Sequence, residues 1–329
     1  MVPNVDSYNR KITYLRVSVT DRCNLRCIYC TPVNNLKLLD HADILSYEEI
    51  LKVIRVATEL GINKVRLTGG EPLYRRNFTH LVESVCLIPR IEDVSITTNG
   101  VFLKEMARPL FEAGVHRINV SLDTLNPLKY TKITSRECFD AVWEGIQVAE
   151  TVGFSPIKVN VVVIRGLNDD ELLRFADFSV RKPYHIRFIE YMPIGRDLNW
   201  TTEHYVSSDE MKSKLKTFGP LLKIPPSIHD GPAERYHFES AKGEIGFISA
   251  ISHHFCPSCN RLRLTADGKL RPCLFADDEV DIKSPLRNGY SHEHLKKVFQ
   301  QAIARKPRRH HAEILEKREG LRPMSTIGG

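Results

Sequence analysis

The feature that most restricts the fold is a unit that occurs six times before residue 192. Each unit has a short β-branched run, a loop and an amphipathic segment of helical period. Units of this kind, about 30 residues long, build parallel sheets with right-handed crossovers. Eight of them close a complete barrel, so six predict an open, curved (β/α)6 TIM-like partial barrel. The expected strands cover residues 14–19, 64–68, 93–98, 117–122, 157–164 and 185–191.

The pattern changes after residue 191. A helical segment at 208–218 precedes turn-rich sequence, and short strands are expected near 236–238, 243–248 and 261–273. A long helix is expected over 291–318. We therefore predict two domains, a partial barrel over residues 1–200 and a smaller α+β domain over 201–329.

Two helix starts carry capping signals. Ser46 with Glu49, and Asn168 with Glu171, have the spacing of a capping box. Cys86 and Cys138 fall within helical patterns, where a lone cysteine is typical of a small buried core residue.

Charge indicates an anionic partner. The 329 residues include 47 Lys and Arg against 40 Asp and Glu, a net charge of +7, which suits phosphate-bearing molecules. The basic stretch 305–311 has no interleaved aromatic residues, so we expect no nucleic acid partner. No apolar run has membrane-spanning length, and charged residues interrupt the first positions, so we expect a cytoplasmic protein without a membrane anchor.

The ends of the expected strands converge on one place. Loops with unusual composition follow them: GGEP at 69–72, TTNG at 97–100, SLD at 121–123 and EYMP at 190–193. Ligands of parallel α/β proteins collect beyond the carboxyl ends of the strands. The sequence therefore predicts a single site at this end of the barrel, and Arg187 and Glu190 are expected to face it with roles left open.

The loop after the first strand contains Cys23, Cys27 and Cys30 as C-x3-C-x2-C. In a chain without an export signal, such grouping favours metal or redox chemistry over disulfides. Three thiolates can hold three corners of a [4Fe–4S] cluster and leave one iron open to a small molecule. A zinc site completed by a distant His or Cys is the alternative.

A second group of three, Cys256, Cys259 and Cys273, lies in the C-terminal part. Zinc with His253 or His254 as fourth ligand is again the alternative. Arg261 and Arg263, two apart on an expected strand, point to one face and suit phosphate oxygens.

The first cysteine loop together with GGEP resembles the radical S-adenosylmethionine (SAM) superfamily. The resemblance implies that the open iron binds SAM and that GGEP contacts its amino group. One electron from the cluster then releases a 5′-deoxyadenosyl radical, so no acid–base catalytic residue is required.

The whole combination, including NVSLDTL, RFIEYMP, FCPSCNRLRLTADGKLRPCL and the terminal GG, resembles the family of GTP 3′,8-cyclases that begin molybdenum cofactor biosynthesis. The resemblance implies a second [4Fe–4S] cluster on the second cysteine group, with its open iron receiving guanine, and a tail, Gly328 and Gly329, that reaches into the site. The implied SAM-binding residues are Tyr29, Gly70, Ser121 and Met192. The implied GTP-binding residues are Arg16, Arg66, Thr97, Lys158, Arg261, Leu262 and Arg263.

The implied reaction is abstraction of H3′ from GTP, attack of C3′ on C8 of guanine, and reduction to 3′,8-cyclo-7,8-dihydroguanosine triphosphate. The implied partners are a reductant protein of the flavodoxin or ferredoxin type and a cyclic pyranopterin monophosphate synthase that takes the product. A homodimer is compatible with the sequence.

Two other functions fit parts of the pattern. A radical SAM enzyme that modifies peptides or cofactors and carries an auxiliary cluster is the first. A zinc-stabilised nucleic-acid-binding protein, favoured by the positive charge, is the second.

Overall fold

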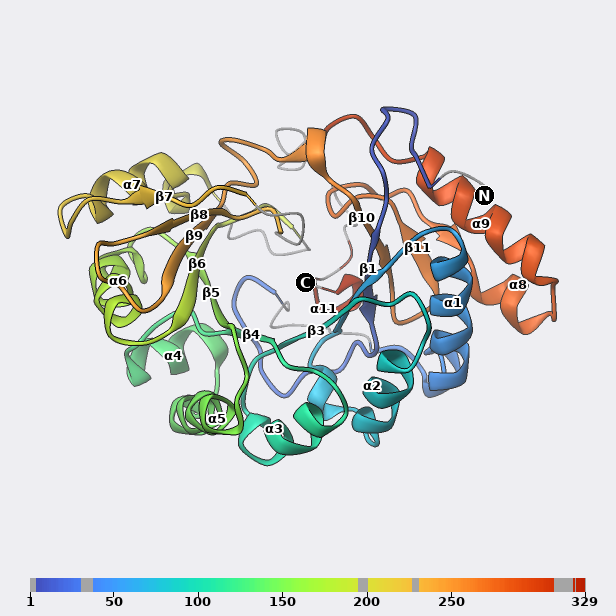
Figure 1. Cartoon of the computed structure of the whole chain (residues 1–329), viewed down its shortest axis with the longest axis horizontal. Coiled ribbons are helices and arrows are strands. Elements are labelled where there is room, and N and C mark those ends of the chain that lie inside the picture. Colours follow the sequence, from blue (N-terminus) through green and yellow to red (C-terminus); the bar gives the residue numbers. More distant parts are fainter. Residues whose placement is uncertain are drawn as a thin grey trace.

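Six parallel strands lie side by side in chain order at the centre of the computed structural model, which describes residues 4–30, 38–194, 201–226, 231–310, 322 and 324–328. Figure 1 shows that they curve around a central space, with helices on the outside. The expected strands are confirmed: β1 Tyr14–Ser18, β2 Lys64–Thr68, β3 Asp93–Thr98, β4 Ile118–Ser121, β5 Ile157–Val163 and β6 Tyr184–Glu190.

The C-terminal strands extend both edges of this sheet. On one edge β10 (Arg261–Leu264) pairs in parallel with β1, and on the other β9 (Glu244–Ile248) pairs in parallel with β6. Antiparallel partners follow outward: β11 (Lys269–Arg271) and β12 (Val280–Asp281) beyond β10, β8 (Glu234–His237) and β7 (Leu222–Lys223) beyond β9. A domain boundary at residue 201 stays a prediction, because strands from both sides of it share one sheet and one apolar core.

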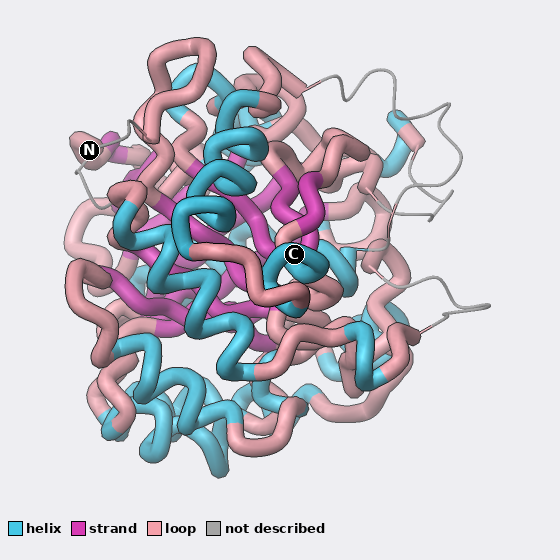
Figure 2. The backbone as a smooth tube through the Cα atoms, turned by 90° about the vertical axis from the view of Figure 1, so that its right-hand side faces the viewer, coloured by secondary structure: helices cyan, strands magenta, loops and turns pink. Residues whose placement is uncertain are grey.

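Except for the C-terminal one, the helices lie on the outer side of the sheet, as Figure 2 shows from one side. No helix among the described residues is both long enough and apolar enough to cross a membrane. The helices are α1 Tyr47–Glu59, α2 Phe78–Cys86, α3 Leu103–Glu112, α4 Pro127–Thr134, α5 Phe139–Val152, α6 Leu172–Arg181, α7 Ser208–Leu215, α8 Lys283–Arg287, α9 His292–Ala304 and α11 Met324–Ile327.

Local signals decide where these helices begin and end. The capping box of Ser46 and Glu49 is confirmed at the start of α1. The fourth unit has two helices, α4 and α5, because Ser135 adopts a left-handed conformation at the end of α4. The helix expected over 291–318 ends at Ala304 in α9, and residues 311–318 lie outside the described residues.

The capping box predicted at Asn168 and Glu171 is wrong. The Asn168 side chain bonds instead to the backbone of Ile164, Asp123 and Val162. The Glu171 carboxylate accepts hydrogen bonds from Thr124 Oγ1 and Leu125 N, so both residues fasten the loop after β4. The sequence pattern cannot distinguish a capping box from side chains of the same spacing that bond to a distant loop.

Alternation along the strands gives the sheet two different faces. In β5 the residues facing the helices, Ile157, Val159, Val161 and Val163, are apolar and at most 2% exposed, whereas Lys158 and Asn160 face the concave side. In β1, Leu15 and Val17 face outward and Arg16 faces inward. Barrel interiors are ordinarily filled with bulky apolar side chains. A concave face that carries cations and amides instead predicts a polar ligand.

The junction between β6 and β9 depends on Gly243. A Cβ at this position would overlap the carbonyl oxygen of Tyr184 and lie 2.6 Å from that of Lys182. We expect Gly243→Ala to lower the free energy of unfolding by roughly 1–3 kcal/mol, the usual cost of overpacking. Gly219→Ala, where the nearest atom is Phe238 Cδ1 at 3.6 Å, is the control and should change it by less than about 0.5 kcal/mol. Equal denaturant midpoints for the two variants would contradict this account of the junction.

Candidate active site

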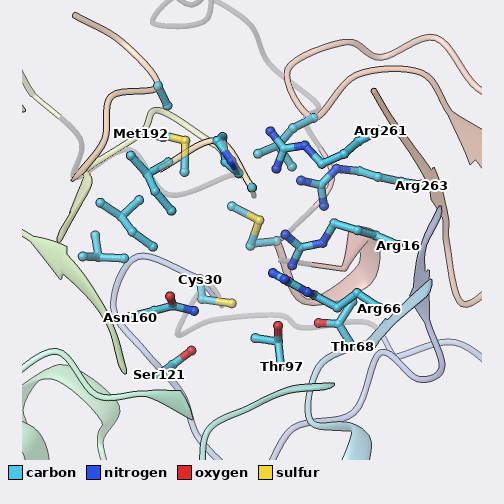
Figure 3. Close-up of a pocket in the computed structure, with 18 of the residues that line it drawn as sticks. Arg16, Cys30, Arg66, Thr68, Thr97, Ser121, Asn160, Met192, Arg261 and Arg263 are labelled. Carbon is cyan, nitrogen blue, oxygen red and sulfur yellow. The ribbon is translucent and has the colours of Figure 1, made fainter. Parts of the chain in front are cut away.

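A cavity of about 280 Å³ lies on the concave face, lined by inward-facing strand residues and by the loops at the carboxyl ends of the parallel strands. The structure brings most of the predicted site residues to its wall, several of which Figure 3 shows. These residues are Cys23, Cys27, Cys30, Cys256, Cys259, Cys273, Tyr29, Gly70, Ser121, Met192, Arg16, Arg66, Thr97, Arg261 and Arg263. The two cysteine groups, more than 220 residues apart in the chain, therefore share one cavity.

The GGEP segment holds the first cysteine loop. Gly70 N donates to Thr20 O at 2.6 Å, and Glu71 N donates to Arg22 O at 2.8 Å. A Cβ on Gly70 would overlap the Arg22 carbonyl, so glycine is needed for the approach of the loop itself. The segment was expected to contact SAM, which stays a prediction; its hydrogen bonds show that it positions the loop that carries the thiols.

Glu71 connects this loop to the end of β3. Its carboxylate accepts hydrogen bonds from Thr98 Oγ1 and Asn99 N, both at 2.7 Å. Burial raises the pKa of Glu71 to about 7, and these hydrogen bonds oppose the rise. The Asn99 side chain in turn lies 3.7 Å from Cys23 Sγ, so the TTNG loop supports the cysteine loop from the other side.

Asp123 is a site residue that the sequence reasoning missed. It lines the cavity, accepts a hydrogen bond from Tyr29 Oη at 2.5 Å and another from Val162 N at 2.8 Å. Burial raises its pKa to about 6 and raises that of Tyr29 well above the usual range. The SLD motif at a strand end was the available signal, but only its serine was assigned.

Arginines form one wall of the cavity. Arg16 lies directly between Arg66 on β2 and Arg263 on β10 in the strand register, and Figure 3 shows these side chains and Arg261 entering the cavity from the same side. Burial, followed by the charges of Arg66 and Arg261, lowers the pKa of Arg16 to about 10. Such crowding of like charges is relieved by a bound polyanion.

Two residues of the predicted GTP set, Leu262 and Lys158, differ in placement from the rest. Leu262 is fully buried in the apolar core between the two arginines of β10, so its side chain faces away from the cavity. Lys158 does not line the cavity. It lies two residues before Asn160 in β5 and on the same face of the strand. Burial, followed by the charges of Arg187 and Arg117, lowers the pKa of Lys158 to about 6.

Arg187 and Glu190, both expected to face the site, have different surroundings. Arg187 lines the cavity and donates to Asn119 Oδ1 at 3.2 Å. Glu190 is not among the lining residues; it accepts hydrogen bonds from Ser208 N, Ile251 N and Ser252 N at 2.7–3.0 Å. Its role visible in the structure is to fix α7 and the segment that leads to the second cysteine group.

The second cysteine group lies among cations. Burial raises the pKa of Cys259, but Arg261 and Lys306 outweigh it, and the pKa falls to about 6. Burial raises the pKa of Cys256. The Arg261 guanidinium also lies 4.7 Å from the ring centre of Phe255, a cation–π contact that positions it beside the cysteines.

The C-terminal segment enters the concave side. Figure 1 shows α11 inside the curve of the sheet. The carbonyl of Gly328 accepts a hydrogen bond from Arg263 Nη1, and Met324 lines the cavity. Arg322 anchors the segment through paired contacts of 2.9 Å with the Asp267 carboxylate. Gly329 lies outside the described residues.

The cavity residues fit a cluster, SAM and a polyphosphate. All eight cysteines are free thiols, three of them in each group at the wall. Thr97 Oγ1 and Asn160 Oδ1 are buried without a hydrogen-bond partner among the described residues, as expected for groups that meet a ligand. Among the described residues no three His, Cys, Asp or Glu side chains gather as ligands of one metal ion.

Comparisons with known proteins agree with this arrangement. The profile of the radical SAM superfamily matches residues 17–179, and the profile described as Molybdenum Cofactor Synthesis C matches residues 184–312. The GTP 3′,8-cyclase of Thermodesulfovibrio yellowstonii is 49% identical, covering 98% of this chain and 99% of that protein. The GTP 3′,8-cyclase of Moorella thermoacetica is 48% identical, with coverage of 98% and 99%.

Solved structures support the fold. SuiB of Streptococcus suis, in its crystal structure bound to S-adenosylmethionine, aligns with a TM-score of 0.58 at 15% identity, over 86% of this chain and 67% of that chain. At this identity the likeness concerns the fold alone. The nearly full-length identity to the curated relatives decides the family. The chain belongs to the radical SAM superfamily and, within it, to the family of the GTP 3′,8-cyclases.

Proposed function

We propose that this chain converts GTP to (8S)-3′,8-cyclo-7,8-dihydroguanosine 5′-triphosphate, the first step of molybdenum cofactor biosynthesis. The observation that carries the proposal is the presence of two three-cysteine groups and an arginine wall around one cavity. The full-length similarity to GTP 3′,8-cyclases supports the choice of substrate.

Cys23, Cys27 and Cys30 would hold one [4Fe–4S] cluster, and Cys256, Cys259 and Cys273 a second. Tyr29, Gly70, Ser121 and Met192 would bind SAM, and the second cluster would receive the guanine end of GTP. When bound, the first cluster and SAM supply the 5′-deoxyadenosyl radical that abstracts H3′ from the ribose.

The substrate is oriented by the asymmetry of the cavity. Arg16, Arg66 and Arg263 provide guanidinium groups for the triphosphate, whose charge offsets their mutual repulsion. Apolar side chains, Val162, Ile189 and Ile248, line the cavity from β5, β6 and β9, on the other side of the curved sheet. An apolar wall beside the reacting sugar keeps water away from a radical centre.

Two partners follow from the chemistry of this reaction. The radical step consumes an electron, which a flavodoxin- or ferredoxin-type protein would supply. The cyclised nucleotide would then pass to a cyclic pyranopterin monophosphate synthase.

The direct test is anaerobic reconstitution with iron and sulfide, followed by incubation with SAM, dithionite and GTP. We expect about eight irons per chain, two clusters of four, and 5′-deoxyadenosine formation that depends on GTP, with the cyclised nucleotide identified by mass spectrometry. Deoxyadenosine formation that is independent of GTP would contradict the substrate. Zinc without sulfide would favour the nucleic-acid-binding alternative.

Arg66→Met tests the arginine wall. Loss of one charged hydrogen bond to phosphate costs about 1.5–3 kcal/mol, so we expect the Kd for GTP to rise about ten- to hundredfold, with SAM binding unchanged. Arg108→Met, at an exposed position of α3, removes the same charge from the convex side and should leave both affinities unchanged. An unaltered Kd for GTP in Arg66→Met would exclude Arg66 from the phosphate site.

We expect Lys158 to take up a proton when GTP binds. With its pKa lowered to about 6, its amine is neutral at pH 7.5, and a triphosphate nearby favours the charged form. Calorimetry of GTP binding in buffers of different ionisation enthalpy should show uptake of close to one proton, which Lys158→Met abolishes. Equal proton uptake in the parent and in Lys158→Met would contradict the assignment.

The same lysine affects stability. Between pH 6 and the unperturbed pKa of 10.5, the unfolded chain holds a proton on Lys158 that the folded chain lacks. Stability of the ligand-free protein should therefore rise with pH across this window, and the rise should be smaller in Lys158→Met.

A further inference from the structure

Lys306 is a buried lysine behind the second cysteine group, two residues after the end of α9. It is 3% exposed, although lysine is among the residues least often buried. No carboxylate of the described residues lies within 4 Å of its ammonium group. A buried ammonium group without a counter-charge is costly, so some other negative group must face it.

The ammonium group of Lys306 joins the two segments that carry the cysteines. Nζ donates to the carbonyl of Arg261, two residues after Cys259, and to that of Pro272, immediately before Cys273, both at 2.8 Å. Lys306 also lines the same cavity as Cys256, Cys259 and Cys273. The negative group that suits this position is therefore the thiolate-ligated cluster that the second cysteine group would hold.

The position of Lys306 is itself fixed. Arg10 donates to Pro307 O and to Cys256 O, both at 2.7 Å, and its Nε bonds to Asp6 at 2.6 Å. Arg10 is 7% exposed and Asp6 4% exposed, so the N-terminal turn holds the segment after α9 rigidly against the cysteine loop. Lys306 consequently has little freedom to move away from the second cysteine group.

The first cysteine group has the opposite electrostatic surroundings. Two buried carboxylic residues lie beside it: Glu71 N donates to Arg22 O, and Asp123 accepts a hydrogen bond from Tyr29 Oη. The basic side chains of this loop bond elsewhere, Arg26 to the backbone carbonyl of Cys23 at 2.6 Å and Arg22 to the Asp21 carboxylate and the Leu39 carbonyl. A buried lysine between the segments that hold the ligands therefore distinguishes the second group. Hydrogen bonds to cluster sulfurs and local charge are what set the reduction potential of an iron–sulfur cluster.

We propose that Lys306 is a positioning residue of the second cluster: its buried ammonium group, held between the carbonyls of Arg261 and Pro272 beside the cysteine ligands, raises the cluster's reduction potential. The inference rests on the proposed function, because it requires a cluster at Cys256, Cys259 and Cys273. A positive charge beside the cluster stabilises the reduced form, which carries one more negative charge. Through the Arg261 carbonyl the same lysine also connects the cluster to the arginine wall that would bind the triphosphate.

The test uses the full chain with Cys23, Cys27 and Cys30 replaced by alanine, so that only the second cluster is loaded. In this background Lys306→Met removes the charge, Lys306→Gln keeps a neutral donor, and Lys306→Arg keeps the charge. Lys11→Met, at an exposed position next to Arg10, is the control. The midpoint potential is measured by redox titration monitored by electron paramagnetic resonance, with iron and sulfide counted in each sample.

We expect Lys306→Met and Lys306→Gln to lower the midpoint potential so that the one-electron equilibrium shifts about tenfold toward the oxidised form, equivalent to 59 mV. Lys306→Arg should retain most of the parent value and Lys11→Met all of it. Full loading with an unchanged potential in Lys306→Met would overturn the inference. Folded Met and Gln variants that both fail to hold iron, or a Gln variant with the parent potential, would also overturn it, by reducing Lys306 to a purely structural support. A parent that binds no four-iron cluster would contradict the proposed function instead.

Discussion

Repulsion between like charges on the concave face is the constraint on which the rest of the structure depends. Arg263, Arg16 and Arg66 are neighbours in the register of three hydrogen-bonded strands, and burial adds to the cost of their charges. The apolar outer face of the same strands, packed under the helices, holds this arrangement in place. The fold thus uses hydrophobic burial on one face to keep an anion-binding surface assembled on the other.

The buried carboxylates near this cationic surface accept hydrogen bonds from the backbone and do not pair with its arginines. Glu71, Asp123 and Glu190 lie at or just after strand ends, and each accepts a backbone N–H of another segment, that of Asn99, Val162 and Ile251, respectively. These contacts tie the strand-end loops to one another and so fix the cysteine groups. Because the carboxylates are occupied in this way, they do not neutralise the arginines that face the cavity.

The sequence allowed the strands and the two cysteine groups to be predicted because both have local signatures. The β-branched runs predicted β1 to β6, and the spacing of the cysteines predicted two ligand groups, which both line the cavity. Properties that depend on tertiary contacts were not predictable in this way. Glu171 caps no helix because Thr124 and Leu125 lie opposite it, and Leu262 points into the core because β10 joins β1. Lys306 belongs to no motif, and only its burial and its hydrogen bonds beside the second cysteine group suggested a role.

The pairing of β1 with β10 has a consequence for synthesis of the chain. Arg16 and Arg263 face each other in the sheet but are separated by most of the polypeptide, so the anion-binding wall remains incomplete until residue 264 has left the ribosome. Until then β1 presents an unpaired edge, a hazard for association with other chains. A chain whose synthesis stops between β6 and β10 therefore exposes this edge and lacks part of the arginine wall, and we expect chaperones to bind it.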